Sequence, residues 1–216
     1  DGVRFTKLEP NPFASPPAGW SFRAYRDPNV FFNPADELFH MLVTARLDAP
    51  AVAGRGGMLA HLVSRDFTQW ELRGPFLLPG LAGTPECADH FFWNGWHYLV
   101  FSNNGVTYHR MSRNALGPWI APPVDTLDCP VSRVMKTAAF SGGRRIGAAW
   151  LGTREGDTDD GRLQFGGNAV LREIVQHADG ALGTASAHEL TPAGVPLANT
   201  HAIALVGNSL LGELSC

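Results

Sequence analysis

A strand–turn–strand unit recurs three times along this chain, and the repeat limits the possible folds more than any other feature. The copies are Val30–Leu42, His90–Val100 and Ala138–Ala148. Each runs through aromatic or apolar residues into a turn and a second apolar stretch, and another apolar run and a polar turn follow. A period of about 48–60 residues is typical of a four-stranded β-propeller blade.

The rest of the chain supports an all-β fold. With 24 Gly and 16 Pro the sequence is cut into short pieces, and helical periodicity is nearly absent. Asn94–Gly95 and Ser141–Gly143 predict hairpin turns, because Gly and Asn tolerate a positive φ. We predict strands in seven short apolar runs, at 30–32, 38–44, 58–63, 97–101, 133–140, 146–151 and 169–175.

A β-sandwich meander would also produce short, evenly spaced strands. Trp70 and Trp119 decide between the two folds, because both follow a polar turn at the point where the fourth strand of a repeat should lie. A recurring Trp at one place in each unit favours propeller blades.

Composition excludes several classes of protein. The chain is 44% hydrophobic, which is enough for a core, and its net charge of −3 gives no general attraction to nucleic acid or an anionic membrane. No apolar run reaches the ~18 residues that would span a bilayer. Cys87, Cys129 and Cys216 are too few for a disulfide scaffold, and we expect Cys87 to be a free thiol.

No metal or cofactor is expected. The eight His are scattered, and no Cys/His spacing resembles a zinc site. The acidic stretch 155–161 lacks the spaced ligands of a calcium-binding loop, so we interpret it as a solvated loop.

Two acidic residues stand out because each lies at the polar start of a segment that runs into an aromatic strand. They are Asp27, within residues 25–29, and Glu86, within residues 84–92. Alone, Asp27 would be read as a turn opener and Glu86 as a solvated loop carboxylate. At similar places in successive repeats, they predict the paired carboxylates that glycoside hydrolysis requires. Asp89, close to Glu86, is expected to be structural.

These residues carry a resemblance to glycoside hydrolase family 32, the invertases, inulinases and levanases. Arg26-Asp27-Pro28 resembles the family's Arg-Asp-Pro motif, and Glu86-Cys87 resembles its Glu-Cys motif. Further on, residues 136–150 resemble a fourth-blade hairpin, and Phe165–Glu173 resembles a fifth-blade segment with Leu171 in place of Pro. The resemblance spans roughly residues 20–190.

The resemblance implies roles for individual residues. Glu86 would be the general acid/base, Asp27 the transition-state stabiliser, and the mechanism would retain configuration at the sugar. The expected substrate-binding residues are Arg26, Cys87, Trp93, Lys136 and Trp150. No Asn-Asp-Pro-Asn motif precedes Arg26, so the family's nucleophile has no counterpart in this sequence.

The same resemblance implies a five-bladed β-propeller, of which we expect about three and a half blades here. Residues 1–190 would form these blades, and residues 191–216 a linker or the start of a C-terminal module. Five blades need about 250–300 residues. Asp1–Phe5 shows neither an initiator Met nor a signal-peptide pattern. We therefore expect a chain without its N-terminal part, completed by a missing segment or a second chain, or else a truncated relative.

The expected activity is retaining hydrolysis of β-fructofuranosides of the sucrose and fructan class, with a carbohydrate as the partner. The isolated 216-residue chain would be inactive if the nucleophile lies elsewhere. Two alternatives stay open: a non-catalytic carbohydrate-binding propeller, and a hydrolase of arabinan or xylan.

Overall fold

The computed structural model describes residues 2–7, 9–190, 204–206 and 209–211, the last two ranges as backbone only. The chain divides into two compact units, Asp1–Ala185 and Ser186–Cys216. The second unit contains η4 (His188–Leu190) and a small hairpin of β15 (Ala204–Val206) and β16 (Ser209–Leu211). The rest of the predicted linker or C-terminal module lies outside the described residues.

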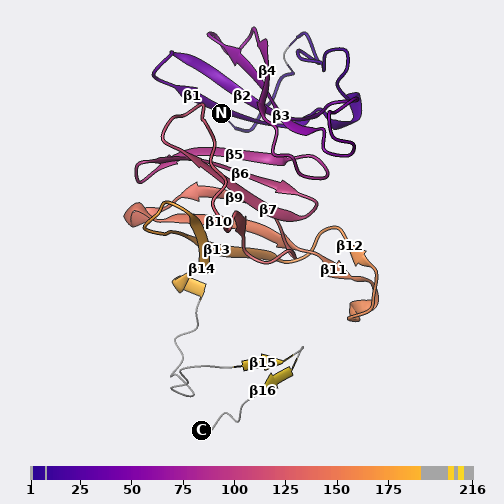
Figure 1. Cartoon of the computed structure of the whole chain (residues 1–216), viewed down its shortest axis with the longest axis vertical. Helices are drawn as coiled ribbons and strands as arrows, with labels where there is room; N and C mark the ends of the chain where they lie inside the picture. Colours follow the sequence, from indigo (N-terminus) through magenta and orange to yellow (C-terminus); the bar gives the residue numbers. More distant parts are fainter. Residues whose placement is uncertain (1, 8, 191–203, 207–208, 212–216) are drawn as a thin grey trace. The chain divides into compact units, whose positions relative to one another are not determined.

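Three four-stranded antiparallel sheets form the first unit and follow one another along the chain (Figure 1). Sheet 1 contains β1 (Arg26–Asn33), β2 (Leu38–Arg46), β3 (Gly57–Ser64) and β4 (Glu71–Leu77). Sheet 2 contains β5 (Glu86–Trp93), β6 (Trp96–Asn103), β7 (Val106–Ser112) and β8 (Thr126–Leu127). Sheet 3 contains β9 (Ser132–Ala139), β10 (Arg145–Leu151), β13 (Ala169–Gln176) and β14 (Leu182–Ser186).

Sheet 3 carries an excursion between its second and third strands. A hairpin of β11 (Thr153–Arg154) and β12 (Leu163–Gln164), joined through the short helix η3 (Glu155–Asp157), stands apart from the sheet in Figure 1. Two other single-turn 3₁₀ helices occur in this unit, η1 (Phe22–Ala24) and η2 (Ser141–Gly143). None of the described helices has the length and apolar character needed to span a membrane.

All seven predicted strands are confirmed, as is the hairpin turn at Asn94–Gly95. Three details of the expectation are wrong. Trp70 precedes β4 and Trp119 precedes an isolated bridge at Ile120, so neither lies in a fourth strand. Residues 165–173 do not open a further blade, because β13 pairs directly with β10 in the sheet that contains Lys136.

Apolar side chains from neighbouring sheets bury one another and fix the order of the sheets. Leu42 and Leu59 of sheet 1 pack with Leu99 and Phe101 of sheet 2, and all four are fully buried. A second cluster joins sheets 2 and 3, with Tyr98, Val100, Leu127, Met135 and Ile174 among its members. Each such side chain contributes about 1.5–3 kcal/mol by leaving water, so neighbouring sheets pack firmly against each other.

The first strand of every sheet contains a β-bulge at the same place. Arg26 and Asn29 of β1 are three residues apart, but their partners on β2, Thr44 and Leu42, are only two residues apart. The same mismatch occurs between Glu86 and Asp89 of β5. The register of β9 also slips, opposite Ala148–Trp150. In each bulge one residue has a left-handed backbone: Asp27 at φ 55°, Cys87 at φ 51° and Val134 at φ 53°.

These bulges change one sequence-based expectation. Asp27 was predicted to hold the position of Glu86 one blade earlier, but the register makes Arg26 equivalent to Glu86 and Asp27 equivalent to Cys87. A bulge re-aims the side chains beside it and is common next to active sites. Asp27 is thus the second residue of its bulge, whereas Glu86 is the first residue of its own.

Candidate active site

Arg26 joins the two predicted catalytic carboxylates. One end of its guanidinium donates a hydrogen bond to Glu86 Oε1, and Nε lies 3.5 Å from Asp27 Oδ2. Because both carboxylates touch the same planar group, they are within about 10 Å of each other, in the range that paired glycosidase carboxylates use. Glu86 remains 32% exposed, so it is open to a substrate.

Cys87 lies next to this pair as a free, half-buried thiol, as predicted. Burial raises the pKa of the thiol, and the neighbouring Asp27, which accepts its hydrogen bond, raises the pKa further. The thiol therefore stays protonated and donates to Asp27. Through this hydrogen bond Cys87 orients the carboxylate of Asp27.

Lys136 reaches the bulge of β5 from sheet 3. Its Nζ donates to the carbonyl oxygens of Cys87, at 3.3 Å, and Ala88, at 2.5 Å. The ammonium therefore holds the left-handed turn of backbone that directly follows Glu86. Sequence resemblance predicted a substrate-binding Lys136, whereas the observed contacts are with the main chain.

Asp89 is buried, with 8% of its surface exposed. Its Oδ2 accepts from Thr137 N at 2.8 Å and from Thr137 Oγ1 at 2.6 Å, and Arg145 Nε donates to the same hydroxyl at 2.7 Å. The network ties β5 to β9 and β10, which agrees with the structural role expected of Asp89.

Sheet 1 supports Glu86 from the other side. Thr44 Oγ1 donates to the carbonyl oxygen of Pro85 at 2.9 Å in a buried contact. A Cβ on Gly57 would stand 1.9 Å from the carbonyl oxygen of Gly83, so the loop before Glu86 passes directly over this glycine. Sequence reasoning missed Thr44 and Gly57, since neither residue type signals such a contact.

The structure does not bring Trp93 to the site. Trp93 ends β5, which Glu86 begins, so the two are about 20 Å apart along the strand at ~3.3 Å per residue. The indole N–H donates to the carbonyl oxygen of Gly143 at 3.0 Å, and the ring packs on the core between sheets 2 and 3. A strand of this length separates its ends too widely for Trp93 to contact the same sugar as Glu86, and the expected role of Trp93 in substrate binding stays a prediction.

Trp150 lies at the Glu86 end of the sheets. Trp150 of β10 is the strand partner of Arg133 of β9. Glu86 of β5 and Ser102 of β6 form the equivalent pair in sheet 2. The indole is half-buried, and the exposed ring of Phe165 lies 5.9 Å from it between centroids. Trp150 thus stands on the rim of the site and not within the Asp27–Glu86 pair.

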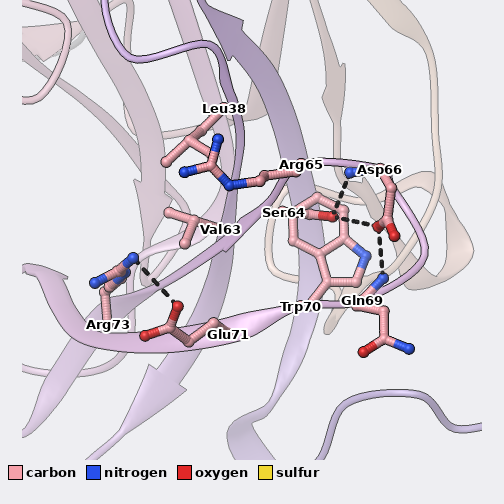
Figure 2. Close-up of a pocket in the computed structure, with 9 residues that line it drawn as sticks. All are labelled: Leu38, Val63, Ser64, Arg65, Asp66, Gln69, Trp70, Glu71 and Arg73. Carbon is pink, nitrogen blue, oxygen red and sulfur yellow. Dashed lines mark hydrogen bonds and ion pairs between the residues drawn. The ribbon is translucent and has the colours of Figure 1, made fainter.

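A separate depression of ≈ 500 Å³ lies at the opposite end of sheet 1, between Leu38 and Arg73 (Figure 2). Both of its acidic groups are engaged. Glu71 forms an ion pair with Arg73 at 3.2 Å, and Asp66 Oδ1 accepts from the backbone N–H of Gln69 at 2.9 Å and of Thr68 at 2.8 Å. These hydrogen bonds lower the pKa of Asp66. The carboxylate stabilises the β3–β4 turn, and the depression holds none of the predicted catalytic residues.

Three successive four-stranded antiparallel sheets, with carboxylates beside the bulges of two adjacent first strands, are typical of a β-propeller domain of the glycoside hydrolase type. The chain belongs to glycosyl hydrolases family 32, whose N-terminal domain matches residues 1–120. The resemblance stated from the motifs is therefore confirmed. No curated protein sequence matches the chain.

Solved structures share the fold. Fructan 1-exohydrolase IIa from Cichorium intybus superposes with a TM-score of 0.64 at 19% identity, covering 86% of this chain and 39% of that one. Sucrose-6-phosphate hydrolase from Lactobacillus gasseri gives 0.60 at 16% identity, with 82% and 39% covered. Xylan β-1,4-xylosidase from Bacillus halodurans C-125 gives 0.58 at 14% identity, with 74% and 33% covered.

These likenesses confirm the all-β propeller type. The chain spans about two fifths of the two fructoside hydrolase structures, at 39% of each. The described part of the chain contains three four-stranded sheets. Beyond these three sheets the described residues include the small β15–β16 hairpin, and the expected further half blade stays a prediction.

Proposed function

We propose that the protein containing this chain hydrolyses β-fructofuranosides of the sucrose and fructan class. One observation carries the proposal: Asp27 and Glu86, from two different sheets, converge on the single guanidinium of Arg26. Membership of family 32 supports it, and so does the fold shared with a fructan exohydrolase and a sucrose-6-phosphate hydrolase.

In this proposal Glu86 is the general acid/base, which protonates the leaving oxygen and then activates water. Asp27 stabilises positive charge on the sugar ring, oriented by the Cys87 thiol and by Arg26. Lys136, Asp89 and Thr44 hold the backbone that carries Glu86. A retaining reaction also needs a nucleophilic carboxylate about 5–5.5 Å from the acid/base. Asp27 is not given that role, since the matching family motif assigns it to stabilisation.

The test is a measurement of fructose release from sucrose, inulin and levan. It compares the full protein with its Glu86→Gln variant, and the isolated 216-residue chain is assayed in parallel. Loss of the acid should reduce turnover by about 10²-fold or more, with activity rescued on substrates whose leaving group needs no proton. Proton NMR of the first product should show the β-anomer.

Each other result has a definite meaning. Unchanged turnover in Glu86→Gln excludes Glu86 as the acid, and an inverted product excludes the retaining mechanism. Binding of fructan without any fructose release identifies a non-catalytic carbohydrate-binding propeller. Fructose release by the isolated chain would mean that it supplies its own nucleophile, with Asp27 the first residue to examine.

A further inference from the structure

The connection between β4 and β5 leads directly into Glu86, and side chains from two sheets hold it in place. Three of its carbonyl oxygens accept side-chain hydrogen bonds: Gly80 O from Arg55 Nη1 at 2.7 Å, Ala82 O from Asn104 Nδ2 at 2.9 Å and Pro85 O from Thr44 Oγ1 at 2.9 Å. Thr44 lies in β2 and Arg55 in the β2–β3 loop of sheet 1, whereas Asn104 lies at the tip of the β6–β7 hairpin of sheet 2. Because backbone carbonyl groups need partners, donors at fixed positions decide the path of an irregular segment.

Asn104 attaches the segment before Glu86 to the hairpin that already pairs with Glu86. Glu86 of β5 is the strand partner of Ser102 of β6. Two residues beyond Ser102, the amide of Asn104 holds Ala82, which lies four residues before Glu86. The segment 82–86 is thus attached to one hairpin at both ends, by the strand ladder at one end and by Asn104 at the other. So short a segment with both ends held has little conformational freedom.

Gly83, which follows Ala82, is enclosed between the two sheets. A Cβ on Gly83 would stand 2.7 Å from Asn104 Oδ1, and a Cβ on Gly57 of sheet 1 would stand 1.9 Å from the carbonyl oxygen of Gly83. Gly83 also has a left-handed backbone, at φ 94°, which glycine adopts without strain. The amide of Asn104 therefore packs against the segment as well as donating to it. Shortening this side chain would leave both a gap and a carbonyl group without its partner.

A second Asn-Gly turn in the same sheet shows that the contact of Asn104 is not a general property of such turns. Asn94–Gly95 joins β5 to β6 at the opposite end of sheet 2, and the φ of Asn94 is 45° against 50° for Asn104. Both asparagines are exposed, and Gly95 and Gly105 share a φ of 83°. Within the described part of the chain the Asn94 amide has no hydrogen bond. The turn requires Asn for its backbone in both places, but only Asn104 holds a neighbouring segment.

We propose that Asn104 is a positioning residue for Glu86: it holds the segment 82–86 against sheet 2, and so fixes the direction in which the Glu86 carboxyl group meets the leaving oxygen. The inference rests on the proposed function, in which Glu86 gives its proton to that oxygen. Asn104 acts through the backbone of this segment and not on the substrate itself. A general acid must lie within hydrogen-bond reach of its target, and small displacements of such a group reduce the rate steeply.

The experiment compares Asn104→Ala with Asn94→Ala in the full protein, on sucrose and on an aryl β-fructofuranoside whose leaving group needs no proton. Both substitutions remove an amide from the same kind of turn, so the backbone strain that they introduce is matched. Asn104→Ala should lower kcat/KM about tenfold on sucrose and less than about twofold on the aryl substrate, because only sucrose needs the acid. Asn94→Ala should leave kcat/KM unchanged on both. In a Glu86→Gln background Asn104→Ala should cause no further loss on sucrose, since the group that it positions is already absent.

Hydrogen exchange provides a measurement that needs no turnover. In Asn104→Ala the backbone amides of the peptide 82–89 should exchange about threefold to tenfold faster, the usual value of one lost hydrogen bond. In Asn94→Ala they should exchange as slowly as in the wild type. If the wild type releases no fructose from either substrate, the proposed function is refuted, and the exchange rates still decide whether Asn104 holds this segment.

Several results would overturn the proposal. They are an unchanged kcat/KM on sucrose in Asn104→Ala, an equal loss on both substrates, an equal loss in Asn94→Ala, a further loss in the Glu86→Gln background, and unchanged exchange in the peptide 82–89. If Asn104→Ala does not fold, Asn104→Asp takes its place, with Asn94→Asp as its control. Asp also tolerates the left-handed conformation, but its carboxylate has no N–H to donate to Ala82 O. The same differences between substrates and between the two turns are then expected.

Discussion

Arg26, the first residue of β1, pairs with Glu86, the first residue of β5, across the boundary between two sheets. Both residues lie beside a bulge, so neither can shift without disturbing the strand that carries it. We expect Arg26→Gln to lower kcat/KM about tenfold to a hundredfold, because two carboxylates lose a shared charged partner. Arg26→Lys should recover only part, since a single ammonium cannot span both groups. Arg23→Gln, an exposed arginine of η1, is the control, and equal kinetics for the two Gln variants would refute this role.

Lys136→Met tests whether Lys136 positions Glu86 or binds sugar. Removing the ammonium frees the carbonyl oxygens of Cys87 and Ala88, so Glu86 loses its fixed direction. We expect kcat to fall about tenfold with little change in KM, because misplaced catalytic groups mainly raise the barrier. A rise in KM at constant kcat would instead mean direct contact with substrate. Lys7→Met, at an exposed position near the N-terminus, controls for the lost charge.

Gly57→Ala should damage both stability and activity. The added methyl would meet the carbonyl oxygen of Gly83 at 1.9 Å and the Cα of Thr84 at 2.7 Å, and both are backbone atoms. Overpacking of this kind costs about 1–3 kcal/mol, and it displaces the loop that leads into Glu86. Thermal denaturation should show a Tm lower by several degrees, on the order of 2–4 °C per kcal/mol.

The matched control for that substitution is Gly183→Ala. There the methyl would meet mainly the ring of His177, an exposed side chain that can turn away. A control as unstable as Gly57→Ala would show that any methyl on these sheets is harmful, and the argument from the Gly83 loop would fail.

Acid should weaken the packing of sheet 2 against sheet 3. Burial lowers the pKa of His109 to about 4, and its Nε2 accepts the backbone N–H of Leu182 at 3.1 Å. Burial likewise lowers the pKa of His61 and of His90 to about 4. Unfolded histidine has a pKa of about 6.5, so the unfolded state binds more protons between pH 6.5 and 4. Stability is therefore complete above about pH 6.5 and declines as the pH falls toward 4.

Urea denaturation at pH 7, 5.5 and 4.5 measures this decline, which is on the order of 1–3 kcal/mol for the fully buried His109. His109→Gln cannot titrate, so its unfolding free energy should vary less with pH than that of the wild type. An identical pH dependence in the two proteins would show that His109 does not contribute.

Sequence patterns predicted the strands well because strand formation depends on local alternation and on turn residues such as Asn94–Gly95. They also found the two acidic motifs, since each stands at the start of an inner strand. They wrongly made Asp27 the equivalent of Glu86, whereas the equivalent residue is Arg26. A bulge adds one residue to a strand, and an apolar run gives no sign of it. The β11–β12 excursion was missed for a similar reason: an insertion between two paired strands lengthens a blade without changing its pattern.

Contacts between sheets were beyond sequence reasoning. The pairing of Arg26 with Glu86 depends on how two sheets pack, and the support from Thr44 and Gly57 depends on where one loop crosses another. Trp93 was assigned to the sugar because aromatic residues often bind sugars, but its distance from Glu86 follows from the length of β5.

The shared bulge means that the site can be erased while Arg26, Asp27 and Glu86 all keep their identities. Successive side chains of a strand point to opposite faces of the sheet. The extra residue at Cys87 therefore exchanges the faces to which the preceding side chains, including that of Glu86, point. Deleting that one residue would restore an unbroken ladder and turn Glu86 toward the opposite face of sheet 2. A change of one residue in length is thus enough to acquire or lose such a site in a propeller blade, and a comparison of side-chain identities would overlook it.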